Sequence, residues 1–165
     1  MDIQDFVTHP FTKFDKDWAL LTAGTADDFN SMTISWGGMG TMWHKPMLFL
    51  VVKPVRYTYD FVNRHAELTV SFYDEVHKKA LALFGSKSGR DMDKAKATGF
   101  TPKVLKNGVT YEEAKETLVC RKLFMQQLNK ENFPEFALDY YKGEKESPAH
   151  YLVLAEVLGI ETKED

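Results

Sequence analysis

Three short polar segments of this 165-residue chain carry side chains that suit a phosphate group and a flat heteroaromatic ring. Asn30–Thr33 (N-S-M-T) offers amide and hydroxyl groups beside backbone N–H donors at the start of an expected strand. Arg56–Thr58 (R-Y-T) stands where a strand gives way to a helix, and an arginine at a helix N-terminus favours anion binding. Lys87–Lys94 (K-S-G-R-D-M-D-K) adds cations and hydroxyls just before another helix.

A phosphomonoester carries about −1.5 to −2 charges at neutral pH, so several converging donors would compensate it better than one cation. Taken singly, each of the three segments is more typical of a solvated surface turn. Their meaning depends on whether the fold brings them together.

The glycine-rich run Gly37–Gly40 (G-G-M-G) invites comparison with a dinucleotide-binding fingerprint. The third glycine of that fingerprint would fall at Trp43, and Lys45-Pro46 follows where a helix should run. We therefore interpret the run as a glycine-bearing turn or bulge between two strands.

Other catalytic or metal-binding patterns are missing from the sequence. The histidines, at positions 9, 44, 65, 77 and 150, have no metal-ligand spacing, so no metal site is predicted. Asp91–Asp93 lacks the rest of a calcium loop, and no G-x-S-x-G motif occurs. Cys120, the single cysteine, lies within an expected strand and is more typical of a buried small apolar residue than of a reactive thiol.

Composition narrows the class of protein. The net charge of −3 and the pI near 6.0 argue against nucleic-acid or anionic-membrane partners. The single cysteine favours a reducing compartment, and the first residues show no secretion signal, so we expect a cytoplasmic protein. Met47–Val52, the longest apolar run, is too short to span a bilayer.

Alternating and continuous apolar runs predict a mainly β protein of the α+β type, a β-barrel with added helices in one domain covering residues 1–165. The predicted strands are Trp18–Thr22, Ser31–Ser35, Met47–Val52, Glu67–Tyr73, Pro102–Leu105, Lys115–Gln126 and Tyr151–Ile160. The predicted helices are Thr58–His65, Val76–Phe84, Asp91–Thr98 (with Asp91 as N-cap and Gly99 at its end) and Pro134–Tyr141.

Taken in order, the polar segments resemble the flavin reductase-like FMN-binding split-barrel family, especially its flavoredoxin-like branch. The resemblance runs from about Phe14 to Ile160. The residues that carry it are Asn30–Gly37 (N-S-M-T-I-S-W-G), Lys45-Pro46, Pro54–Thr58 (P-V-R-Y-T), Phe84–Asp91 (F-G-S-K-S-G-R-D), Cys120-Arg121 and His150.

This resemblance implies a six-stranded split β-barrel that forms a homodimer and holds FMN near the subunit interface. The residues matching those that line the ring and ribityl chain are Asn30, Ser31, Met32, Thr33, Ser35 and Trp36. Those matching the phosphate-holding segments are Arg56, Thr58, Ser88, Arg90 and Lys94. His150 matches a histidine near the flavin, but Pro148-Ala149 replaces the usual Gly-Asp before it, so a structural or interface role stays equally open.

Two functions follow from the resemblance. The first is an NAD(P)H-dependent flavin reductase, which needs no catalytic side chain because the flavin ring performs the redox chemistry. The second is a flavoredoxin-like electron carrier with tightly bound FMN, supplied by a redox protein and without NAD(P)H activity. A third reading, a split barrel whose pocket serves another ligand, is disfavoured by the presence of all three polar segments.

Overall fold

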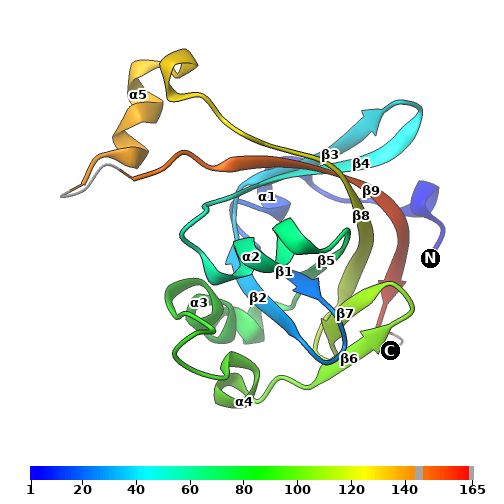
Figure 1. Ribbon diagram of the computed structural model, residues 1–165. Coiled ribbons are helices and arrows are strands. Elements are labelled where there is room, and N and C mark those ends of the chain that lie inside the picture. Colours follow the sequence, from blue (N-terminus) through cyan, green and yellow to red (C-terminus); the bar gives the residue numbers. More distant parts are fainter. Residues whose placement is uncertain (144–146, 164–165) are drawn as a thin grey trace.

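One seven-stranded antiparallel sheet organises the part of the chain that the computed structural model describes, residues 1–143 and 147–163. Its strand order is β2-β1-β5-β8-β9-β4-β3 (Figure 1). The strands are β1 (Ala19–Gly24), β2 (Phe29–Ile34), β3 (Gly37–Met42), β4 (Lys45–Val52), β5 (Glu67–Phe72), β8 (Glu116–Gln127) and β9 (Tyr151–Thr162). A separate hairpin pairs β6 (Pro102–Leu105) with β7 (Gly108–Tyr111).

The mainly β character with added helices is confirmed, but the strand count differs from the six that were expected. The main sheet has seven strands, and within the described residues its two outer strands, β2 and β3, do not pair with each other. β2 is therefore an edge strand, with one side of its backbone turned away from β1.

The interpretation of Gly37–Gly40 as a turn or bulge is wrong, because these residues begin β3 and pair in regular register with β4. The reason for the glycines is a close approach. A Cβ on Gly38 would lie 2.3 Å from Cε1 of Phe49, so the phenyl ring covers the glycine directly. The small residues make room for an aromatic side chain rather than for a change of direction.

Short helices surround the sheet, and all of them but the first lie near positions predicted from the sequence. They are α1 (Pro10–Lys13), α2 (Tyr57–Arg64), α3 (Lys78–Ser86), α4 (Lys94–Thr98) and α5 (Glu135–Leu138), with 3-10 turns η1 (Ile3–Asp5), η2 (Glu75–His77), η3 (Lys130–Asn132) and η4 (Asp139–Tyr141). None of the helices in the described residues has the length and apolarity that a membrane crossing requires.

The N-cap of α4 is Asp93, not Asp91 as predicted. The Asp93 carboxylate accepts a hydrogen bond from the Lys96 N–H at 3.0 Å, which satisfies one of the free donors of the first turn. Gly99 ends the helix in the left-handed conformation, as expected, with φ +76°.

Two apolar clusters lie on opposite sides of β1 and β2. The larger one fills the inside of the curved sheet, and α2 covers it with Phe61 and Val62. The smaller one joins Leu20, Phe84 and Phe100, under α3 and the β6–β7 hairpin. β2 lies between them, so its position is set by packing on both faces.

A long arm extends from the sheet (Figure 1). The second half of β8 and the start of β9 form its two strands, and α5 lies at its end, shown in yellow to orange. The arm folds over far enough to bring Tyr140 and His150 against Trp36, with ring centroids 5.2 Å apart in both pairs. It therefore completes one side of the site described next.

Candidate functional site

Two adjoining cavities lie along the outer edge of β2. The first, of about 320 Å³, is called the Trp36 groove and is lined by Met32, Thr33, Ile34, Ser35, Trp36, Val51, Lys53, Arg56, Tyr140 and His150. The second, of about 120 Å³, is called the Ser88 pocket and is lined by Asn30, Met32, Val55, Arg56, Tyr57, Thr58, Ser86, Lys87, Ser88, Gly89 and Lys94. Met32 and Arg56 line both, so the two cavities share a wall.

The fold brings most of the sequence-predicted site residues to these cavities. The residues found there are Asn30, Met32, Thr33, Ser35, Trp36, Arg56, Thr58, Ser88, Lys94 and His150. Three segments that are separated in sequence thus meet at one edge of the sheet, although each alone resembles an ordinary surface turn.

Two predicted residues, Ser31 and Arg90, point elsewhere. The Ser31 hydroxyl lies 2.7 Å from Thr22 Oγ1 on β1 and 2.8 Å from the Tyr111 hydroxyl on β7, so these two side chains hold it. The Arg90 guanidinium donates to Asp60 Oδ2 at 2.8 Å and lies over the Tyr57 ring. Neither side chain lines the Trp36 groove or the Ser88 pocket in the described structure.

Arg56 stands at the N-cap of α2 and borders both cavities. Its Nη2 donates to the Gly85 carbonyl at 2.7 Å, and burial lowers the pKa of this guanidinium. Beside it, the Thr58 hydroxyl accepts a hydrogen bond from Asn30 Nδ2 at 2.7 Å. The beginning of α2 is therefore joined to both β2 and the end of α3.

Lys94, the first residue of α4, is 5% exposed. Its ammonium donates to the carbonyl oxygens of Ser31, Phe84 and Lys87, the latter two at 3.2 and 3.3 Å. Burial, and then the charge of Arg56, lower the pKa of Lys94 to about 8. The ammonium is thus held by neutral carbonyl groups beside a second cation.

His150 lies at the other end of the site, in the Trp36 groove. Its Nδ1 is 2.7 Å from the Tyr141 hydroxyl. Burial, and then the charge of Lys53, lower the pKa of His150 to about 4, so the imidazole is neutral at pH 7.

Three lining residues, Val51, Lys53 and Tyr140, lie outside the segments that the sequence singled out. Others lie within those segments but were not predicted as site residues: Ile34, Val55, Tyr57, Ser86, Lys87 and Gly89. Lys53 directly precedes the predicted segment Pro54–Thr58, so its position in the sequence could have indicated that it lies near the site. Nothing in the sequence indicates Tyr140, because only the folding of the arm brings it next to Trp36.

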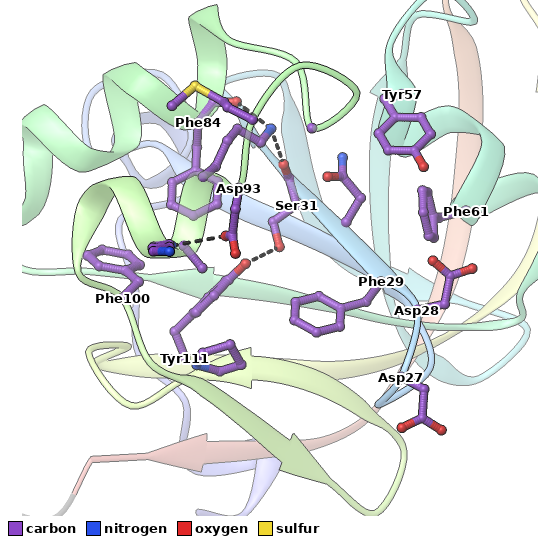
Figure 2. Close-up of a pocket in the computed structure, with 17 residues that line it drawn as sticks. Asp27, Asp28, Phe29, Ser31, Tyr57, Phe61, Phe84, Asp93, Phe100 and Tyr111 are labelled. Atoms are coloured by element: carbon purple, nitrogen blue, oxygen red, sulfur yellow. Dashed lines mark hydrogen bonds between the residues drawn. The ribbon is translucent and has the colours of Figure 1, made fainter.

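The charge of the site distinguishes it from a larger cavity on the other face of β2. Lys53, Arg56, Lys87 and Lys94 line the groove and the pocket, whose described lining residues include no carboxylate. The other cavity, of about 650 Å³, is called the Tyr111 cavity (Figure 2) and has Asp27, Asp28 and Asp93 in its wall, together with Lys94 and Lys96. Size alone would favour the Tyr111 cavity, but an anionic ligand fits the other two.

The described residues show no cluster of metal-ligating side chains, and the cysteine lies in the core. Within residues 1–143 and 147–163, no group of three or more His, Cys, Asp or Glu side chains is arranged to hold a metal ion. Cys120 is buried as predicted, and burial raises the pKa of its thiol, which makes the reactive thiolate unfavourable.

The sequence profile described as "Flavin reductase like domain" matches residues 11–165, and the chain belongs to that family. No curated protein sequence matches the chain.

Solved structures with the same fold include flavoredoxin from Methanosarcina acetivorans, with a TM-score of 0.71 and 18% identity over 99% of this chain and 75% of that one. An FMN-binding protein from Thermus thermophilus gives 0.70 and 18% over 96% and 79% of the two chains. The styrene monooxygenase flavin reductase from Pseudomonas putida S12 gives 0.65 and 18% over 90% and 80%. At these identities the likeness shows a shared fold.

The protonation of His150 is directly testable. NMR titration of its imidazole should give a midpoint of about 4, and Lys53→Met should raise it by removing a nearby positive charge. The unfolded chain takes up this proton near pH 6.5 and the folded chain only near 4, so His150 should lower the free energy of unfolding as the pH falls through that window. A midpoint near 6.5 in the folded protein would contradict the buried, neutral histidine.

Proposed function

We propose that the protein binds FMN and acts as an NAD(P)H-dependent flavin reductase. The observation that carries this proposal is a groove with aromatic side chains that shares Met32 and Arg56 with a small neighbouring pocket, the two lined by four cations and, among their described residues, by no carboxylate. A ligand with a flat ring at one end and a negatively charged phosphate at the other is complementary to aromatic side chains beside cations.

The residues present fit such a ligand. The Trp36 groove, at about 320 Å³, lies within the roughly 300–1,000 Å³ typical of small-molecule sites. Met32, Thr33, Ser35 and Trp36 would border the ring, with Asn30 and the free backbone edge of β2 beside the ribityl chain. Arg56, Thr58 and Ser88 would hold the phosphate, with Lys87 adding charge.

When bound, the flavin would supply the redox chemistry, and the protein would set its position and surroundings. Trp36 and His150 would offer ring surfaces at one end of the groove against which the flavin could pack. Because His150 is neutral at pH 7, it would pack against the ring region rather than deliver a proton. The cations along β2 would favour negative charge that develops on a bound ring.

An electron carrier of the flavoredoxin type is the second candidate. Tyr140 is 60% exposed and Trp36 43%, and the two rings pack edge to face at the rim of the groove. Exposed aromatic side chains beside a redox site suit contact with a protein partner. The structural likeness to flavoredoxin from Methanosarcina acetivorans supports the same reading.

The assembly we propose is a homodimer of single-domain chains, residues 1–165. Phe49, Leu154 and Phe124 are neighbours across β4, β9 and β8, and the two phenylalanines are 47% and 40% exposed. An apolar row of this kind on an open sheet suits burial against a second copy. A split barrel, with its split between the unpaired edges of β2 and β3, is the finer description we propose for the sheet. Light scattering that gives the mass of one chain, 19.0 kDa, at micromolar concentration would contradict the dimer.

The reductase and the carrier differ in one measurement. The purified protein, loaded with FMN, should absorb at about 450 nm, as oxidised flavins do, and should bleach rapidly when NADH or NADPH is added without oxygen. A yellow protein that neither nucleotide bleaches would support the carrier. A protein that binds no added FMN would exclude both.

The phosphate position can be tested at Arg56. Arg56→Ala should weaken FMN binding about 10- to 100-fold, because it removes a charged donor, and should change riboflavin affinity little. Arg64→Ala is the matched control, since Arg64 lies at the other end of α2 and lines neither cavity. Equal weakening of FMN and riboflavin would remove Arg56 from the phosphate site.

A further inference from the structure

A hydrogen bond within the arm holds the His150 ring. Its Nδ1 lies 2.7 Å from the hydroxyl of Tyr141, whose side chain is buried. We propose that Tyr141 donates this hydrogen bond and thereby fixes the tautomer of His150 in which Nε2 carries the proton. His150 then offers a neutral N–H donor to a ligand in the Trp36 groove. The tautomer is independent of the proposed function, whereas the contact with a flavin rests on it.

The hydrogen bond can run in two directions, because a neutral imidazole has one donor and one acceptor nitrogen. If Nδ1 of His150 carried the proton, the Tyr141 oxygen would accept it, and the phenolic proton would need another acceptor. Among the described residues, the Tyr141 hydroxyl has no second hydrogen-bond partner. If Tyr141 donates, one bond satisfies both its proton and the Nδ1 lone pair. Donation by Tyr141 is therefore favoured, since a buried donor without a partner is costly.

Two ammonium groups beside the Tyr141 ring act in the same direction. Nζ of Lys53 lies 5.6 Å from the ring centroid, and Nζ of Lys130 lies 5.3 Å from it. Positive charge nearby makes a hydroxyl oxygen a weaker acceptor and its hydrogen a stronger donor. Burial, and then the charge of Lys53, also lower the pKa of His150 to about 4. The imidazole is therefore neutral at pH 7, which leaves Nδ1 free to accept.

The other ring nitrogen of His150, Nε2, is available to a ligand. It has no hydrogen-bond partner in the described part of the chain, where the buried side-chain atoms without a partner are Thr8 Oγ1, His65 Nε2 and the Tyr73 hydroxyl. Nε2 of His150 is not one of these buried atoms, so it is accessible. Because His150 lines the Trp36 groove, with its ring centroid 5.2 Å from that of Trp36, a ligand in the groove would lie beside it.

A neutral N–H donor selects a hydrogen-bond acceptor on the ligand. Lys53 and Arg56 line the same groove as cations and attract negative charge. His150 instead favours an uncharged acceptor, such as a carbonyl oxygen on a flat ring, and the flavin ring carries such oxygens. Tyr141 does not line the groove and would act through His150, so it is a positioning residue.

NMR reads the tautomer directly, because the nitrogen chemical shifts of an imidazole distinguish a protonated from an unprotonated ring nitrogen. In the full chain at pH 7, without flavin, His150 should show a protonated Nε2 and an unprotonated Nδ1. Its signals are identified by their loss in His150→Gln. Tyr141→Phe keeps the aromatic ring but removes the donor, so a population with a protonated Nδ1 should appear.

Tyr151→Phe is the matched control for the loss of a phenolic hydroxyl. Tyr151 follows His150 directly, but its hydroxyl forms a hydrogen bond with Tyr59 and it does not line the groove. This variant should keep the tautomer of the unaltered protein.

Riboflavin tests whether the donor reaches a ligand, because it has the ring without the phosphate. Tyr141→Phe should weaken riboflavin and FMN by the same severalfold factor, since a hydrogen bond at the ring is lost or misdirected. This pattern differs from that of Arg56→Ala, which should weaken FMN and leave riboflavin almost unchanged. Binding of either flavin should also shift the Nε2 resonance of His150.

A protonated Nδ1 in the unaltered protein, or an unchanged tautomer in folded Tyr141→Phe, would overturn the role of Tyr141. The first of these measurements needs no variant, so it decides the matter even if Tyr141→Phe does not fold. Riboflavin that binds without moving the Nε2 resonance would overturn the contact with the ligand. Failure to bind any flavin would overturn the proposed function and that contact, but not the tautomer, which is measured without ligand.

Discussion

Two cations lie at the edge of β2, and the described residues around their pocket supply no carboxylate. Lys94 is buried and bonded only to carbonyl oxygens in the described structure, and the partly buried Arg56 nearby lowers its pKa further. Uncompensated charge in such surroundings is costly, and an anion entering the pocket would relieve the cost. The same carbonyl groups belong to β2, to α3 and to the turn that follows α3 at Lys87 and Ser88. By binding all three, Lys94 sets how these elements meet around the pocket.

The end of the site at Trp36 is formed by side chains from the arm. Strands β8 and β9 continue beyond the sheet, and the chain between them returns Tyr140 and His150 to Trp36. A neutral imidazole packed on an indole makes an apolar surface that a flat ring would contact. The site thus combines aromatic side chains in the groove with cations in both the groove and the pocket, which suits a ring followed by a phosphate.

Membership of the flavin reductase-like family agrees with this arrangement without specifying its details. Identities near 18% preserve the fold, while the residues that decide ligand and partner are free to differ. In this chain, Lys94, Gly89 and Arg90 hold the turn that follows α3 against β2 and α2.

The sequence by itself determined the mainly β character, most strands and helices, and the three segments that carry polar groups, because hydrophobic periodicity and turn residues are local signals. Only the tertiary structure decided that Gly37–Gly40 is strand beneath Phe49, that the Ser31 side chain faces away, and that Arg90 fastens a turn to α2. Lys94 shows the reason most clearly. Its residue type predicts a cation, but one of the carbonyl groups that hold it belongs to Ser31, 63 residues earlier in the chain. Only the folded chain brings β2 close enough for that hydrogen bond.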